Sequence, residues 1–149
     1  MNLRTYRDQD LDNLLEVWWD SWHSSSSFRH PAPIAAWKTR WENLLLTHKV
    51  IVVEDGETLI GFAAVEPMQR ELSQIFVAPT HKGNGYGKVL FDWARGICGD
   101  SMKLKTLVEN TEARSFYAAR GMKEGAHSIN DFNGMKQVVF TFETRTNAV

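Results

Sequence analysis

The sequence predicts an α+β fold built on one mixed sheet with helices on both faces. Strand-like and helix-like segments follow the order βααββ, then βα, βα and ββ. Strands joined by a hairpin are antiparallel, whereas strand-to-helix units favour parallel neighbours, so the sheet has to be mixed. A wholly parallel, doubly wound sheet does not fit this order.

Length and composition indicate one domain, residues 1–149, with a sizeable core. Lys and Arg number 17 against 18 Asp and Glu, and this near-neutral balance argues against a nucleic-acid or membrane partner. Cys98 is the only cysteine, which excludes an internal disulfide and favours a reducing compartment. No apolar run has the length of a signal peptide core or a membrane span, so we expect a cytoplasmic protein.

The first segments are a short strand and an amphipathic helix. Leu3–Tyr6 is strand-like, and Asp8 or Asp10 can cap the helix that follows. The apolar stripe of this helix comprises Leu11, Leu14, Leu15, Trp18 and Trp22. Residues 24–33 contain four serines and two prolines, and we expect them to end the helix and form a loop.

A second helix is predicted from Ile34 to Leu45. Its stripe comprises Ile34, Trp37, Trp41, Leu44 and Leu45. Core packing therefore accounts for the tryptophans of both stripes. Trp19 lies off the stripe, and an aromatic lining near Trp19, Phe28 and the loop from Ser24 to His30 could grip an amine acceptor through cation–π contact.

The clearest hairpin joins residues 50–54 to residues 57–65. Asp55 and Gly56 between them suit the positive φ angles of a tight turn. Glu71–Val77 is a further strand, which Pro79 stops.

The second half alternates helices and strands. A helix that ends near Cys98 carries this cysteine on its buried stripe, and Lys103–Val108 is the next strand. Asn110 or Thr111 can cap another helix, and glycines at positions 99 and 121 end the two helices. Two strand-like segments follow, the last with apolar residues at positions 138, 140 and 142, as in a half-buried antiparallel strand.

The strongest chemical signal is the glycine-rich segment from Lys82 to Gly87, between a strand and an amphipathic helix. Backbone amides at the start of a helix attract anions, and glycines let phosphates approach them. The segment is not a nucleotide P-loop, because Lys82 stands where glycine is needed and Val89 where Ser or Thr should hold magnesium. It is not a dinucleotide fingerprint either, because Lys88 occupies the place of the last glycine. A plain glycine-rich turn is the alternative interpretation.

A second segment runs from Asn110 to Gly121. By itself it is a capped helix that ends at a glycine. Core packing explains Phe116 better than Tyr117, because a buried tyrosine hydroxyl needs a polar partner.

Taken together, these segments resemble the GNAT superfamily of acetyl-CoA-dependent N-acyltransferases over nearly the whole chain. Lys82-x-x-Gly85-x-Gly87 is similar to the pyrophosphate-binding motif of the family, with Lys82 where Arg or Gln is usual. Asn110-x-x-Ala113-x-x-Phe116-Tyr117-x-x-x-Gly121 is similar to its later motif, in which the asparagine contacts the cofactor and the tyrosine approaches its sulfur. The resemblance implies a mostly antiparallel sheet that splays between its fourth and fifth strands and receives the pantetheine arm there.

The resemblance therefore implies acetyl-CoA as the acyl donor and no metal. The residues that it assigns to cofactor binding are Ile75, Phe76, Val77, Lys82, Gly83, Asn84, Gly85, Tyr86, Gly87, Lys88, Asn110, Phe116 and Tyr117.

Acetyl transfer to an amine needs a base, an oxyanion donor and an acid for the thiolate. Tyr117 is the candidate acid, and a backbone amide near Val77 is the candidate oxyanion donor. Glu71 is the candidate base, because it lies 11 residues before Lys82, where some histone-type members resemble it in carrying a glutamate. Three other side chains, or a chain of waters, could serve instead. These three are Glu66, Ser73 and His127.

Two alternatives to this chemistry are disfavoured. The five histidines form no HExxH pattern and have no CxxC companion, so zinc is unsupported. Cys98 on a packed face should resist ionisation, which disfavours an acetyl-cysteine intermediate.

The predicted function is N-acetyl transfer by direct attack of a primary amine in a ternary complex. The alternative is an acyl-CoA-binding regulatory module of the same fold with little catalysis. The acceptor could be a small molecule or a peptide, and the apolar C-terminal strand could pair across a homodimer.

Overall fold

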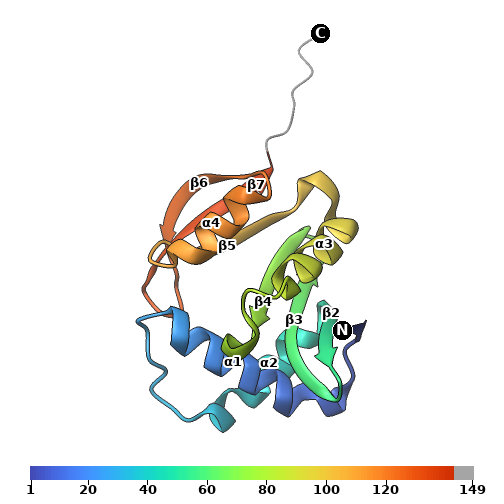
Figure 1. The fold of residues 1–149 in the computed structure, drawn as a ribbon. Helices are drawn as coiled ribbons and strands as arrows, with labels where there is room; N and C mark the ends of the chain where they lie inside the picture. Colours follow the sequence, from blue (N-terminus) through green and yellow to red (C-terminus); the bar gives the residue numbers. More distant parts are fainter. Residues whose placement is uncertain (143–149) are drawn as a thin grey trace.

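The computed structural model describes residues 1–142 and contains a seven-stranded sheet in the order β1-β2-β3-β4-β5-β7-β6 (Figure 1). The strands are β1 (Asn2–Thr5), β2 (Lys49–Asp55), β3 (Thr58–Glu66), β4 (Glu71–Val77), β5 (Lys103–Leu107), β6 (Met122–Ile129) and β7 (Lys136–Phe142). The α-helices are α1 (Leu11–Ser25), α2 (Lys38–Leu46), α3 (Tyr86–Cys98) and α4 (Thr111–Ala119). Short 3-10 helices are η1 (Asp8–Asp10), η2 (Ile34–Trp37), η3 (Pro79–His81) and η4 (Gly99–Ser101). The predicted order of strands and helices is confirmed.

Neighbouring strands pair antiparallel with one exception, the parallel pair of β4 and β5. These two strands share a single register pair, Glu71 with Lys103, and diverge beyond it (Figure 1). The sheet is therefore mixed and mostly antiparallel, and it is splayed between its fourth and fifth strands as predicted.

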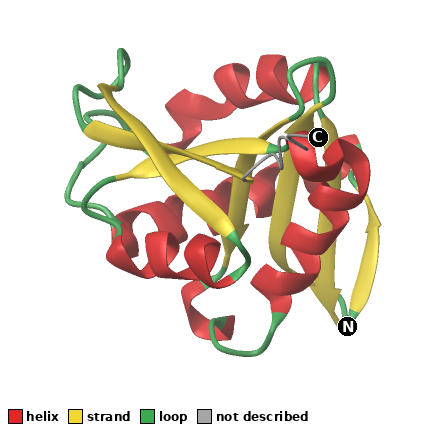
Figure 2. Cartoon of the chain, turned by 90° about the horizontal axis from the view of Figure 1, so that it is seen from above, coloured by secondary structure: helices red, strands yellow, loops and turns green. Residues whose placement is uncertain are grey.

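Two apolar clusters hold the helices against the two faces of the sheet, and Figure 2 shows helices on both sides of the strands. One cluster joins α3 and α4 to the sheet, and Leu90, Phe91 and Phe140 are fully buried in it. The other joins α1 and α2 to the opposite face around Leu14 and Phe62. Burial of these side chains supplies most of the driving force for the fold.

Cys98 lies in the α3 cluster with 4% of its surface exposed, which confirms its predicted burial. Burial raises the pKa of its thiol, so the thiolate is disfavoured.

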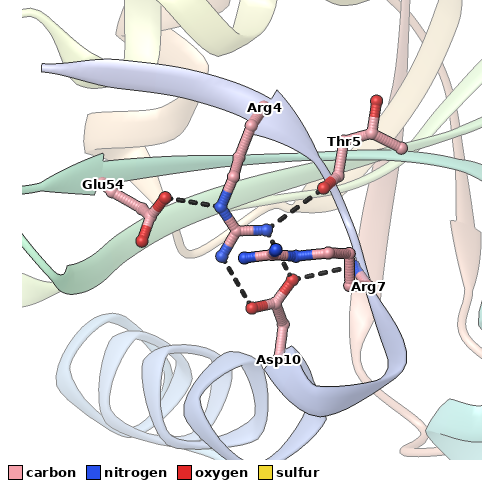
Figure 3. A network of polar contacts seen from close by, with 5 residues as sticks. All are labelled: Arg4, Thr5, Arg7, Asp10 and Glu54. Carbon is pink, nitrogen blue, oxygen red and sulfur yellow. Dashed lines mark hydrogen bonds and ion pairs between the residues drawn. The ribbon is translucent and has the colours of Figure 1, made fainter.

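The start of α1 differs from the prediction in the role of Asp10. This residue precedes the helix, but its carboxylate makes no capping bond to α1. It accepts hydrogen bonds from the Arg4 guanidinium at 2.7 and 2.8 Å and from the Arg7 backbone N–H at 2.8 Å (Figure 3). Arg4 also donates to Glu54, so one guanidinium ties β1 to β2 and to the first turn of α1. The hydrogen bonds from Arg4 lower the pKa of Asp10, against the effect of burial.

The end of α1 also differs, because the helix continues through Ser24 and Ser25. Both hydroxyls donate to the carbonyl oxygen of Ser21, at 2.9 and 2.8 Å. These hydroxyls bond to a backbone carbonyl one turn earlier, a local pattern that lets serine remain within a helix. The loop therefore begins two residues later than predicted.

The hairpin between β2 and β3 forms where it was predicted, with one change in its turn. Gly56 has a φ of 63°, but Asp55 keeps a negative φ and pairs with Thr58 as a strand residue. The prediction of positive φ at both positions was wrong at Asp55, because the two-residue loop is Gly56 and Glu57.

The C-terminal strand β7 lies inside the sheet, between β5 and β6. Both of its edges are hydrogen-bonded, so the predicted pairing of this strand across a homodimer is wrong. Within residues 1–142 no helix is long and apolar enough to cross a membrane.

Candidate active site

A one-residue bulge in β4 shapes the splay. Ala64 of β3 pairs with Gln74 and Val65 pairs with Leu72, so Ser73 is an extra residue without a partner on β3. Bulges bend and twist the strand that carries them. The bend begins just beyond the single pair that joins β4 to β5.

Backbone groups of β4 point into the gap. The N–H of Ala78 donates to Ile60 of β3 at 2.7 Å. Because N–H groups alternate in direction along a strand, those of Ile75 and Val77 point away from β3, toward β5. Since β5 has already diverged, these amides are free to bind a ligand.

A cavity of about 730 Å³ occupies the splay. Its lining comes from the last turn of α1, from β4, the turn after β4, β5, α4, and the hairpin between β6 and β7. This volume lies within the range that binds drug-sized ligands and cofactors.

The turn after β4 forms an anion cradle at one end of the cavity. Gly83 and Gly85 both have a φ of 84°, and nothing lies within 4 Å of where their Cβ atoms would be. Gly85 precedes the first turn of α3, whose N–H groups have no partners within the helix. Both glycines line the cavity, but Asn84 does not, because its side chain turns to donate to the His81 carbonyl at 3.3 Å.

The charges that line the cavity favour an anion. The lining contains four cationic side chains and two carboxylates, namely Lys82, Lys88, Lys105 and Arg120, and Glu71 and Glu112. Lys82 lies 3.9 Å from Glu112, and the ammonium of Lys88 is paired with Asp92 at 2.7 Å. The excess positive charge fits a ligand that carries several phosphates.

The sequence interpretation missed Arg120 as a lining residue. Its guanidinium lies 3.9 Å from the centre of the Phe116 ring, and its buried Nε has no hydrogen-bond partner in the described part of the chain. The available signal was its place directly before Gly121, at the end of the second motif.

Tyr117 projects from α4 and lines the cavity from the side of the α3 cluster. Its ring lies 5.5 Å from that of Phe140 and 6.2 Å from that of Phe91. Burial raises the pKa of the phenol well above its usual value of about 10, so the hydroxyl keeps its proton at neutral pH. Among residues 1–142 this hydroxyl has no hydrogen-bond partner. It is therefore a proton donor without a protein acceptor.

Asn110 and Phe116 position α4 beside the cavity. The side-chain oxygen of Asn110 accepts from the Ala113 N–H at 3.0 Å, which confirms the predicted cap. A Cβ on Gly87 would lie 3.5 Å from the Phe116 ring, an ordinary contact distance, so the first turn of α3 packs beside this ring of α4.

The structure separates the four candidate bases into two pairs. Glu71 and Ser73 line the cavity. The Glu66 carboxylate instead accepts hydrogen bonds from the backbone of Met68 and Gln69 in the turn after β3. His127 lies exposed on β6, outside the cavity lining.

Another part of the cavity is lined by polar side chains, of which the sequence interpretation had named only the Ser24–His30 stretch. They are Ser21, Ser25 and Ser26 from the end of α1, and Asn130, Asn133 and Gln137 from the β6–β7 hairpin. Trp22 lines the cavity beside them, although its stripe had placed it in the core. Trp19 and Phe28 do not line it, so the predicted aromatic lining was wrong in its members. No local pattern marks these residues, because the two segments meet only in the folded chain.

Several contacts join the segments beside these residues. Ser27 donates to Glu109 at 2.8 Å, and the Phe132 ring lies 5.5 Å from that of Trp37. The Arg40 guanidinium stacks on Phe132 at 4.0 Å. The loop after α1 is thereby joined to the start of α4, and η2 and α2 are joined to the β6–β7 hairpin. In residues 1–142 no group of His, Cys, Asp and Glu side chains could hold a metal ion.

Comparison with solved structures supports this fold. The chain is similar to a GCN5-related N-acetyltransferase from Rhodopseudomonas palustris (TM-score 0.81, 17% identity, 95% of this chain and 94% of that chain). It is also similar to apo YjaB from Escherichia coli (TM-score 0.78, 19% identity, 95% and 96%). A third match is the PaiA N-acetyltransferase from Thermoplasma acidophilum in complex with coenzyme A (TM-score 0.73, 21% identity, 96% and 100%). No curated protein sequence matches the chain.

The family model described as acetyltransferase (GNAT) family matches residues 11–122, which include β4, the anion cradle, α3 and α4. The matched span thus contains both sequence motifs and most of the cavity lining. The chain belongs to the GNAT acetyltransferase family.

Proposed function

We propose that this protein transfers an acetyl group from acetyl-CoA directly to a primary amine in a ternary complex. The observation that carries the proposal is the cavity in the splay, whose lining includes both the anion cradle of Gly83 and Gly85 and the buried residue Tyr117. The cradle and the surplus of cationic side chains suit the phosphates of CoA. The free amides of Ile75 and Val77 suit the amide-bearing pantetheine arm.

Acetyl-CoA supplies the acyl group as a thioester, and the side chains around it hold and move protons. The amide of Val77 is placed to stabilise the oxyanion that forms when an amine attacks the thioester carbonyl. Tyr117 then gives its proton to the thiolate as the carbon–sulfur bond breaks. We retain Glu71 as the candidate base, because it is the one carboxylate among the predicted bases that lines the cavity.

We assign to the acceptor the part of the cavity lined by the serines of α1 and by the polar side chains of the β6–β7 hairpin, and call it the acceptor end. Its surroundings favour a small amine over a residue within a protein. A polypeptide acceptor needs an open groove on both sides of its reactive residue. Here η2 and α2 meet the β6–β7 hairpin through Phe132, and the loop after α1 meets the start of α4 through Ser27. The serine and amide side chains beneath this contact can hydrogen-bond a small polar acceptor.

Two measurements test the proposal in sequence. Isothermal titration with acetyl-CoA, CoA and ATP should show saturable binding of the two CoA species and little binding of ATP. Thiol release from acetyl-CoA, followed with a panel of primary amines, should then depend on the amine. CoA-selective binding without thiol release would indicate an acyl-CoA-binding regulatory module instead. Absence of binding would contradict the proposal that the anion cradle holds the phosphates of CoA.

A further inference from the structure

A serine and a histidine from distant parts of the chain meet beside the cavity. Ser73 is the bulged residue of β4 and lines the splay. Its Oγ lies 3.0 Å from Nε2 of His48, which stands in the turn between α2 and β2. The mechanism proposed above uses neither side chain.

The second ring nitrogen of His48 fixes which group donates in this pair. Nδ1 lies 2.7 Å from the Leu44 carbonyl oxygen, which can only accept a hydrogen bond. Nδ1 therefore carries the proton, and Nε2 of the neutral ring presents its lone pair to Ser73. The Ser73 hydroxyl donates to Nε2, which leaves a lone pair of Oγ available to accept a proton from the cavity.

His48 also reaches a second cavity, of about 410 Å³, at the other end of this contact. The ionisable side chains that share its lining are Tyr6 and Lys49, and no carboxylate is among them. His48 is half-buried, and its Nδ1 lies 3.0 Å from the exposed hydroxyl of Thr47. Ser73 and His48 thus form a continuous polar link from the splay to the surface.

We propose that His48, acting through Ser73, receives the proton that the acceptor ammonium loses before attack. The proposal rests on the proposed acetyl transfer. Ser73 Oγ takes a proton from the ammonium group while its own proton passes to His48 Nε2, so the amine becomes neutral and the ring becomes an imidazolium. The imidazolium then returns one proton to water. Imidazole suits this task because it gains and loses a proton near neutral pH. This route does not require Glu71 to hold the proton.

The test compares two amines of similar size that differ in protonation. Methylamine is almost entirely an ammonium ion at pH 7.5 and must lose a proton before it can attack, whereas hydroxylamine is almost entirely neutral and can attack directly. Thiol release from acetyl-CoA is followed with each amine for wild type, Ser73→Ala, His48→Gln and the double variant. The uncatalysed rate is subtracted, and thermal unfolding checks that each variant is folded. Ser101→Ala, in the exposed turn before β5, is the matched serine control.

With methylamine we expect kcat to fall about 100-fold in each single variant, within the usual range for loss of a general base. KM for acetyl-CoA should not change. The double variant should be no slower than the single variants, because both residues serve one route. Hydroxylamine turnover should be nearly unchanged.

Equal losses with both amines would show a structural role and overturn the proposal. Unchanged methylamine turnover in the variants, with a loss in Glu71→Gln, would assign the proton to Glu71 alone and also overturn it. If wild type transfers acetyl to neither probe nor to any amine of the panel, the proposed function itself fails.

Discussion

At the scale of single residues, the environment of Tyr117 accounts for its proposed role. A phenol in water is a weak donor that bulk solvent can replace. In α4 the phenol is packed between aromatic rings, its pKa is raised by burial, and its hydroxyl faces the cavity without a protein acceptor. A thiolate that forms beside it is the acceptor that this hydroxyl lacks.

Tyr117→Phe should therefore lower kcat about 100-fold and leave KM for acetyl-CoA nearly unchanged, because the ring packing is kept and only the proton donor is lost. Steady-state thiol release measures kcat and KM, and titration calorimetry measures CoA affinity. An unchanged kcat would remove Tyr117 from the acid role.

His30 gives a second prediction at this scale, on stability. Its ring lies 5.0 Å from that of Trp18 and 4.8 Å from that of Trp37, and its Nδ1 lies 2.9 Å from His23 Nε2. Burial, with smaller effects of His23 and Arg40, lowers the pKa of His30 to about 4. The unfolded chain, with an ordinary histidine pKa of about 6.5, binds the proton more readily than the folded chain between these two values.

Neutral His30 thus makes its full contribution to the free energy of unfolding above pH 6.5. This contribution declines as the pH falls from 6.5 toward 4. His30→Asn should flatten this decline, since asparagine does not titrate. Urea unfolding at pH 7.5, 5.5 and 4.5 measures the effect. The same pH slope in the variant and in wild type would assign the loss to other groups.

At the scale of elements, the β6–β7 hairpin controls the acceptor end through Phe132. Its ring packs on Trp37 and under Arg40, although almost half of its surface is exposed. Loss of about 1 kcal/mol from this contact would open the hairpin several-fold more often. We therefore expect the hairpin to influence which acceptors reach the cavity.

Phe132→Ala should increase acetylation of a lysine-containing peptide several-fold relative to a small amine, with CoA affinity unchanged. Competition between the two acceptors in one reaction, resolved by mass spectrometry, measures the ratio. Ile129→Ala, on exposed β6, is the control for loss of an apolar side chain. An unchanged ratio would mean that the hairpin does not limit access.

Elements defined by their own sequence were predicted well, and features that depend on distant partners were not. The stripe of α1 and the cap at Asn110 are local, and both were found. The role of Asp10 depends on Arg4 across the sheet edge, and the bulge at Ser73 is a property of the register with β3. The acceptor end lacks a local pattern because α1 and the hairpin are more than 100 residues apart. Resemblance to the family placed the cradle and Tyr117, but it could not place Arg120 or His48.

At the scale of the whole molecule, the sheet consists of two parts joined by one backbone pair. β1 to β4 form one part, β5 to β7 form the other, and Glu71 with Lys103 is the register pair between them. A ligand in the splay that contacts both parts should stabilise the molecule as a unit.

CoA at 100 times its Kd should stabilise the folded state by about 2.7 kcal/mol and raise Tm by about 10 °C, whereas ATP should have little effect. Hydrogen exchange should show the largest protection at the amides of β4, at Ile75 and Val77. Protection confined to the anion cradle would mean that the ligand binds by its phosphates and does not bridge the two parts of the sheet.

The early parting of β4 from β5 gives this sheet two strand edges in its interior, besides the outer edges at β1 and β6. Outer edges can pair with strands of other chains, whereas these interior edges face the cavity, which is lined in part by α1, α3 and α4. Any linear compound with amides at the spacing of a strand can be hydrogen-bonded there as a surrogate strand. Short extended peptidomimetics are thus a natural starting point for ligands of this cavity, whatever the acceptor is.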